Sequence, residues 1–491
     1  MKPQVTLKLP GLQNDSPWQV EEMDWVIPGG SHSAVISTLI KHPQQLSPDM
    51  IKDWLGNALE IRSPAGEVLW HGWIENIHLV LDRLTFRWGT QAVANRVIAR
   101  FPQVSPLLNP LQPWGYSEWV QDAASCEHLG AKEQLLTLTQ ADANSARQAA
   151  ANHMGHYVRD FQRGLVLSEA RATPQLRLIA RGWWQRLDWT LDGEDAGILA
   201  HLPGGKSQQA FGLIGNERLA QRFQVGVADF QLGQINLRAA LIENPADQVR
   251  VKICADSANR PGTVLASATL PNYALHGGWQ WLTWQLDTAL NLTAGTVAWL
   301  VVERTGGLDA ANHYALETDD GRGYPDGECR IWNGSDWVLL AQDLRFCLLA
   351  VAQSSDLIRE VAEQAVAGGV LQGVQIWKDS GMLLTRWRAL EQTRRDVLEE
   401  WLGLGCADGS QLSALVNPDG ILEVFALPRL PELPLILGTD GSLRLPSGIA
   451  LPPALDLLGR PMLLPGAGSQ DVVILRGLRW TEEEGVVPVV E

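Results

Sequence analysis

The sequence predicts a mainly β protein with some α-helix, built from β-barrel or sandwich domains around an inserted β-sandwich. The first observation is alternation: Val249, Val251 and Ile253 fall on one face of an expected strand, and Arg250 and Lys252 fall on the other. Side chains of a strand point to opposite faces in turn, so this pattern is typical of half-buried strands. The second observation is that turn signals separate the runs, as in Asn-Arg-Pro-Gly at 259–262 and Asn-Gly at 333–334.

Length and composition limit the number of domains and the classes of function. The chain has 491 residues, which predicts about three or four domains. Its net charge of −16 argues against nucleic-acid recognition as the main task, because phosphate binding needs clustered Lys and Arg. None of the five cysteines forms a CxxC pair, which fits reduced thiols in a protein assembled in cytoplasm. The sequence has no run of 18 apolar residues, so no membrane span is predicted, and no signal peptide is expected at the start.

Taken in order, the chain divides into five segments. They are an N-terminal β-barrel domain (1–105), the first part of a mixed α/β domain (106–204), the inserted sandwich (205–352), the second part of the α/β domain (353–427) and a Pro-rich β segment that closes the barrel (428–491).

Within the first segment we expect two consecutive hairpins. Residues 58–62 and 68–74 flank a Ser-Pro-Ala-Gly turn, and residues 74–80 and 84–88 flank the polar pair Asp82-Arg83. Three helices are expected further on. They cover residues 141–157, a segment that begins after an N-cap at Ser355 and ends at Gly368, and residues 385–402 with a Glu391–Arg395 pair.

The middle segment contains sequence motifs that are more specific than alternation alone. Val-Lys-Ile-Cys-Ala-Asp-Ser-Ala-Asn-Arg-Pro-Gly-Thr-Val-Leu-Ala (251–266) is followed by a strand with Trp284, by Leu290–Val302, and by Asp-Leu-Arg-Phe at 343–346. This order resembles the jelly-roll modules of bacterial surface and phage proteins, some called choice-of-anchor domains and some likened to carbohydrate-binding modules. The resemblance covers nearly the whole stretch and implies a sandwich that contacts glycan or a neighbouring subunit.

A second resemblance lies on both sides of this module. Pro28-Gly-Gly, Leu59-Glu-Ile-Arg, Gly72-Trp-Ile-Glu and Arg181-Gly-Trp, followed after residue 353 by a helix, strand, helix and hairpin, look like phage tail hub proteins. That family implies a ring at the distal end of a tail, with the chain as a homo-oligomer, as a trimer. It also implies tail tube or distal tail proteins on one side, and fibre or spike proteins on the other. The location implied is the virion tail.

Sugar binding by the sandwich would need aromatic side chains that stack on sugar rings. The candidates are Tyr273, Tyr314, Tyr324 and Trp332, whereas Trp284 and Trp337 sit where related modules keep core aromatics. Host surface glycan is the ligand class that these candidates would bind.

We predict no catalytic centre, no cofactor and no metal centre. Asp319, Asp320 and Asp326 are candidate calcium ligands, because hard cations bind clustered oxygens, but solvated loop carboxylates are the preferred interpretation. The same interpretation is preferred for Glu303 and Glu317 over a pair of glycosidase carboxylates. No nucleophile elbow, HExxH or phosphate loop is present.

The expected function is therefore a non-enzymatic baseplate hub or tail-tip protein that carries an outward sandwich. One alternative is a hexameric distal tail protein with a carbohydrate-binding module. The other is a glycan-active enzyme with a binding module.

Overall fold

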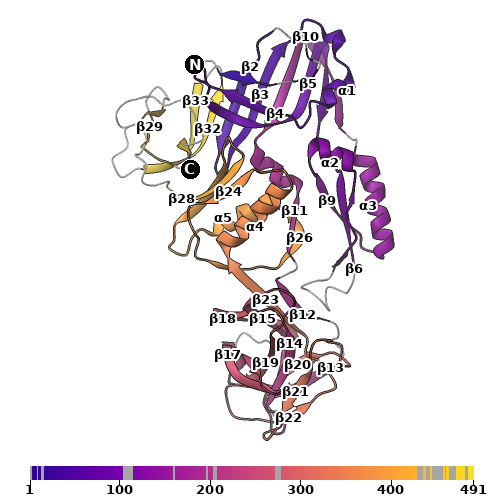
Figure 1. Cartoon of the computed structure of the whole chain (residues 1–491), viewed down its shortest axis with the longest axis vertical. Coiled ribbons are helices and arrows are strands. Elements are labelled where there is room, and N and C mark those ends of the chain that lie inside the picture. Colours follow the sequence, from indigo (N-terminus) through magenta and orange to yellow (C-terminus); the bar gives the residue numbers. More distant parts are fainter. Residues whose placement is uncertain are drawn as a thin grey trace.

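The structure, a computed structural model, describes most of the chain. It covers residues 3–7, 9, 10, 12, 16–102, 114–158, 161–194, 197–202, 207–270, 278–427, 435–437, 443–444, 457–458, 460–463, 472–481 and 485–490. The predicted class is confirmed, because antiparallel sheets dominate and helices are few. The molecule is elongated, with the N-terminal sheet at one end and the sandwich at the other (Figure 1).

The N-terminal end is built on one large sheet. In order across the sheet, its strands are β1 (Gln4–Thr6), β4 (Ala58–Arg62), β5 (Val68–Gly89), β10 (Gln162–Arg181), β3 (Gly29–Leu39), β2 (Gln19–Val26), β32 (Val472–Thr481), β31 (Pro461–Leu463), β29 (Leu435–Leu437) and β30 (Leu443–Arg444), with β33 (Gly485–Val490) beside β32. Among the described strands this order is an open path, so the barrel predicted for residues 1–105 is not closed.

A long ribbon replaces one of the two predicted hairpins. The hairpin β4–β5 is confirmed, but residues 74–80 and 84–88 lie in the same strand, β5, instead of forming a second hairpin. Asp82 takes a φ of 55° and pairs with Ala172 at a bulge in the ladder. The partner of β5 is β10, which contributes 20 residues from the segment expected to be mixed. The second hairpin prediction was therefore wrong because a bulge was taken for a turn.

Glycines let the strands of this sheet approach closely. A Cβ on Gly72 would lie 2.0 Å from the carbonyl oxygen of Arg181, and a Cβ on Gly182 would lie 1.6 Å from that of Ser31. Gly29 has a φ of +130°, and a Cβ there would lie 3.1 Å from the ring of Trp184. Three glycine-containing motifs that are separate in sequence thus lie together where β3, β5 and β10 come together.

A small module stands to one side of the large sheet (Figure 1). Its elements are β6 (Arg96–Pro102), β7 (Trp114–Tyr116), β8 (Val120–Gln121), α2 (Ala123–Leu129), β9 (Glu133–Thr137) and α3 (Ala143–Tyr157). The helix expected at 141–157 is confirmed as α3, which begins after its N-cap Asp142 and buries Ala146 and Ala150 against β6. The short elements η1 (Pro43–Gln45) and α1 (Pro48–Lys52) lie between β3 and β4.

The segments before and after the sandwich fold together. The segment η2 (Trp183–Trp189) continues from β10, and β11 (Leu191–Glu194) pairs with β26 (Arg388–Thr393). The strand β27 (Gln411–Val416) pairs in parallel with the start of β3. It also pairs with β28 (Ile421–Leu427), which in turn pairs with β24 (Gly373–Ile376). One apolar core joins Trp184 and Leu187 to α4 (Ser354–Ala367) and α5 (Arg394–Leu404).

Two helix boundaries differ from the prediction. The N-cap of α4 is Gln353 rather than Ser355, and its end at Gly368 is as expected. The helix predicted for residues 385–402 begins only at Arg394, since residues 388–393 pair with β11 and Thr393 closes a capping box with Asp396. Arg395 forms its i,i+4 ion pair with Glu399 rather than with Glu391.

Two sheets face each other in the sandwich. The first contains β12 (Ile198–His201), β23 (Phe346–Gln353), β15 (Phe230–Ile242), β20 (His313–Thr318) and β13 (Ser207–Phe211), with β18 (Gln280–Leu292) beside β15 and β25 (Leu383–Thr385) beside β23. The second runs β17 (Pro261–Leu270), β16 (Val249–Asp256), β19 (Val297–Arg304), β14 (Arg218–Gln224), β21 (Cys329–Trp332) and β22 (Trp337–Leu339).

The predicted alternation places side chains as expected. Val249, Val251 and Ile253 of β16 are buried in the core between the sheets, together with Trp284 and Phe346. The first sheet also takes in β12, which lies before residue 205, and β25, which lies after residue 352. Because β12 pairs with β23, the chain enters and leaves the sandwich on adjacent strands.

The five cysteines are free thiols. In the part of the chain that the structure describes, no helix is both long enough and apolar enough to cross a bilayer.

Candidate functional site

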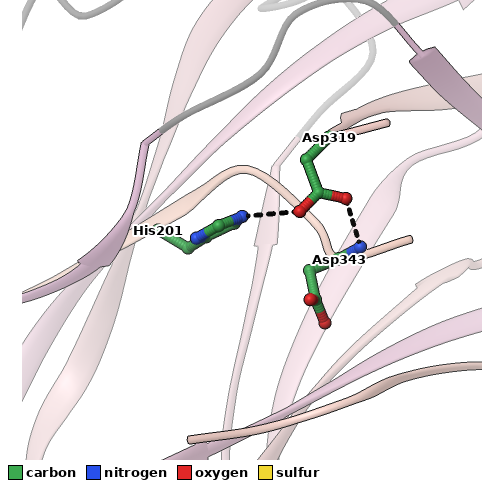
Figure 2. Close-up of side chains that lie close together, drawn as sticks. All are labelled: His201, Asp319 and Asp343. Atoms are coloured by element: carbon green, nitrogen blue, oxygen red, sulfur yellow. Dashed lines mark hydrogen bonds and ion pairs between the residues drawn. The ribbon is translucent and has the colours of Figure 1, made fainter. Parts of the chain in front are cut away.

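The cluster of titratable side chains that best fits a site lies inside the sandwich. His201 is the last residue of β12, Asp319 directly follows β20, and Asp343 lies shortly before β23 (Figure 2). All three are buried, and one donor atom from each lies within 4.8 Å of the others. Sheet pairing brings them together, since β12 and β23 are neighbours and β20 lies in the same sheet.

Four N–H groups surround the carboxylate of Asp319. Its Oδ2 accepts from His201 Nε2 at 3.0 Å and from the main chain of Gly323 at 2.9 Å. Its Oδ1 accepts from the main chain of Asp343 at 2.7 Å and of Gly321 at 3.3 Å. A Cβ on Gly323 would lie 2.8 Å from Asp319 Oδ2, so a glycine lets this loop close over the carboxylate.

The carboxylate of Asp343 has fewer partners. Its Oδ1 accepts from Gln221 Nε2 at 3.0 Å, and its Oδ2 accepts from the main chain of Tyr324 at 3.1 Å. Gln221 is itself held by the N–H of Leu344, which donates to Gln221 Oε1 at 2.8 Å. Both donors to Asp343 are uncharged.

The negative charge of the cluster affects a neighbouring thiol. Burial raises the pKa of Cys329, and the charges of Asp343 and Asp319 raise it further. Cys329 is thus a protonated core residue rather than a reactive thiol.

The other acidic residues singled out in the sequence lie elsewhere. Asp320 and Asp326 are exposed, as the preferred interpretation of solvated loop carboxylates expects, and the structure does not group these two candidate calcium ligands with the buried Asp319. His201 and Asp343 were missed because they lie 118 and 24 residues from Asp319 along the chain. The available signal was a polar residue at the end of an apolar strand, as in Ile-Leu-Ala-His at 198–201.

Glu303 and Glu317 are not solvated loop carboxylates, as the preferred interpretation had it. Both are buried in strands, in different sheets. Glu317 binds Arg345 at 2.8 Å and Arg238 at 2.6 Å, whereas Glu303 binds Lys252 at 2.5 Å. Each is paired with cations and not with the other.

The aromatic candidates for glycan contact divide into three groups. Tyr314 is fully buried, its hydroxyl donating to the carbonyl oxygen of Asp247 at 2.8 Å, so its ring face is closed to a sugar. Tyr324 is only 8% exposed and packs edge-on against Phe346, while burial raises its pKa to about 12. These two candidates were wrong because their rings fill the core. Tyr273 lies outside the described residues.

Trp332 is the remaining candidate. It is half-buried in the hairpin β21–β22, where its ring centroid lies 5.5 Å from that of Trp337. Trp284 is confirmed as a core residue, with its Nε1 donating to the carbonyl oxygen of Val249 at 3.2 Å. The same expectation for Trp337 was wrong, because this side chain is half-buried at the edge of the sheet.

Comparison with known proteins gives little. No family model matches the chain, and no curated protein does. A clostridial cysteine protease, Cwp84, aligns at 9% identity over 70% of this chain and 73% of its own, with a TM-score of 0.23. A family 43 arabinoxylan arabinofuranohydrolase from Bacillus subtilis aligns at 9% identity, 58% and 63% coverage and a TM-score of 0.17. The Cry4Aa toxin from Bacillus thuringiensis aligns at 7% identity, 72% and 58% coverage and 0.18. Likenesses this weak carry no argument about function.

Proposed function

We propose that the chain is a structural component of a phage or phage-like tail, a hub or tail-tip protein that forms a ring at the distal end. The observation that carries this proposal is that the sequence motifs resembling hub proteins lie together in the structure. Gly29, Gly72 and Gly182 come from three of the motifs on which the resemblance rests. Gly72 and Gly182 approach backbone carbonyls of Arg181 and Ser31, and Gly29 approaches the ring of Trp184, at one place in the sheet. These motifs therefore belong to one structural unit and are not three unrelated turns.

The continuity of the body supports the same proposal. Residues before the sandwich pair with residues after it, as β11 does with β26 and β3 does with β27. The ion pair of Arg395 with Asp188 adds a side-chain link between the two halves. The sandwich is then an insertion into one body, which suits a module carried outward by a ring-forming part.

In this proposal the body contacts copies of itself as a trimer, with tail tube or distal tail proteins on one side and fibre or spike proteins on the other. The sandwich lies at the far end of the molecule from the N-terminal sheet (Figure 1), where it would meet host glycan or a neighbouring subunit. The half-buried pair Trp332 and Trp337 is the aromatic surface that favours such a contact.

The test is electron microscopy of the purified full chain with symmetry left free. A threefold ring with three outward lobes is the expected result. A sixfold ring would replace the hub with the hexameric distal tail alternative. A monomer that binds or cuts polysaccharide would overturn the proposal in favour of the enzyme alternative.

A further inference from the structure

The buried carboxylates of this chain follow a rule with two exceptions. Five carboxylate residues of the described part are buried, and three of them have an Arg or Lys partner: Asp192 with Arg388, Glu303 with Lys252, and Glu317 with Arg238 and Arg345. The two without such a partner are Asp319 and Asp343, which lie side by side. Burying charge without a counter-charge is unfavourable, and two neighbouring carboxylates disfavour each other's ionisation.

His201 cannot balance both charges. A proton on its imidazole offsets one carboxylate and leaves the other without compensation. The remaining contacts of Asp343, from Gln221 and the main chain of Tyr324, are neutral donors. A divalent cation would offset both charges at once.

We propose that His201, Asp319 and Asp343 bind one divalent transition-metal ion, with Zn²⁺ as the reference ion. An imidazole nitrogen and carboxylate oxygens are donors that Zn²⁺ takes in proteins. His201 Nε2 and Asp319 Oδ2 lie 3.0 Å apart. Two donors about 2.1 Å from a tetrahedral Zn²⁺ stand about 3.4 Å apart, so these two atoms would separate by about 0.4 Å on binding. The ion would replace the hydrogen between these two atoms.

Asp343 lies close enough to take part after a movement of at most about 1.4 Å. Its donor atom lies within 4.8 Å of the other two, and each of its oxygens has one hydrogen bond and so keeps a lone pair. The N–H groups of Gly321, Gly323 and Tyr324 would act as outer contacts that orient the ligands.

The donor set favours a transition ion over calcium. Ca²⁺ takes about six to eight oxygen ligands, and here two buried carboxylates and a nitrogen are gathered. The exposed Asp320 and Asp326, which would have completed an oxygen cage, are not part of the group.

The ion would tie together three chain segments that are far apart in sequence. His201 ends β12, Asp319 follows β20 and Asp343 precedes β23. The unfolded chain does not hold these donors together, so the ion would bind the folded sandwich and stabilise it. This inference is independent of the proposed tail function and stands or falls separately.

The experiment uses the full chain treated with a chelator and then dialysed against ZnCl₂, with zinc counted by mass spectrometry and Tm measured in parallel. We expect one zinc per chain and a higher Tm with zinc. His201→Gln and Asp343→Asn should each weaken binding by about tenfold or more, since loss of even an outer-shell contact has that effect. Asp326→Asn is the matched control and should bind like the unmodified chain.

Two results would overturn the site. One is the absence of stoichiometric zinc uptake and of any Tm change in the unmodified chain, which would make the cluster a metal-free hydrogen-bond network. The other is zinc binding that persists in both ligand variants. If a variant does not fold, Co²⁺ added to the unmodified chain gives a second readout: its visible absorption reports nitrogen and oxygen ligation, and a spectrum equal to that of hydrated Co²⁺ would also overturn the site.

Discussion

The Nε2 atom of His71 lies 3.2 Å from the carbonyl oxygen of Val416, across 345 residues of sequence. Because a carbonyl only accepts, Nε2 carries the hydrogen. His71 is 2% exposed, and burial lowers its pKa to about 4 from the usual 6.5. This neutral side chain therefore links β5 to β27, the strands that belong to opposite sides of the sandwich insertion.

We predict that His71 makes stability depend on pH. Its folded pKa is depressed, so the contribution is fully present above pH 6.5 and is lost as pH falls from 6.5 towards 4. Between pH 7 and pH 5 the free energy of unfolding should fall by about 2 kcal/mol from this group. Urea titrations give the slope of the free energy of unfolding against pH. This slope should be smaller for His71→Gln than for the unmodified chain, by about 2 kcal/mol over the interval from pH 7 to pH 5. Exposed His42→Gln is the control, and equal slopes for all three chains would contradict the prediction.

The glycine contacts predict a substitution with a large cost. In Gly182→Ala the new Cβ meets the backbone oxygen of Ser31 at 1.6 Å, and backbone atoms cannot rotate away. We expect a loss of about 3 kcal/mol or a failure to accumulate as folded protein. Gly155→Ala in α3 is the control: its Cβ meets nothing within 4 Å, so we expect a gain of about 0.5–1 kcal/mol. Equal unfolding midpoints for the two variants would show that β3 and β10 do not approach as described.

The ion pairs of the sandwich predict a contrast between buried and exposed arginines. Arg345 has a fully buried side chain that binds Glu317, and Arg345→Met leaves that buried carboxylate with Arg238 alone. Because Glu317 keeps Arg238 as a partner, we expect a loss of about 1.5–3 kcal/mol, typical of a hydrogen bond to a charged group. Arg260→Met breaks a half-exposed pair with Asp336 and should cost less than about 1 kcal/mol. Denaturant unfolding followed by Trp fluorescence measures both, and similar losses in the two variants would contradict the difference in burial.

The capping box predicts where α5 begins. Thr393 accepts from the N–H of Asp396 at 3.2 Å, and the Asp396 side chain accepts in return from the N–H of Thr393 at 3.2 Å. Thr393→Ala should reduce stability by about 1 kcal/mol, whereas Thr393→Ser should be close to neutral. A chain in which both variants unfold at the same denaturant concentration would favour the longer helix predicted from periodicity.

Local patterns predicted the sandwich well because its strands alternate over their whole length. Val249, Val251 and Ile253 identify the buried face of β16 without any knowledge of its partners. The β5–β10 ribbon was not predictable in the same way. The polar pair Asp82-Arg83 satisfies the rules for a turn, and only the presence of β10 alongside makes it a bulge. Likewise, residues 388–393 have helical periodicity, but pairing with β11 decides their structure.

The candidate site shows the same limit. Asp319 was found together with Asp320 and Asp326 because they are close in sequence, yet their side chains lie in different environments. Its true neighbours come from strands that only the assembled sheet brings together. Tyr314 and Tyr324 were chosen for their chemistry alone, and chemistry does not distinguish a ring that faces solvent from one that fills a core.

The pairing of β2 with β32 also has a consequence for synthesis. Residues 22–26 pair with residues 477–481, so about 450 residues are added before the strand beside β2 exists. At roughly 5–20 residues per second, that takes between about 20 and 90 s. Over this interval one edge of β2 has no β32 beside it, and an open edge is a template for wrong partners. The sandwich, by contrast, can join β12 to β23 as soon as residue 353 has been made. The strand that covers the β2–β3 hairpin is therefore made about 450 residues after that hairpin.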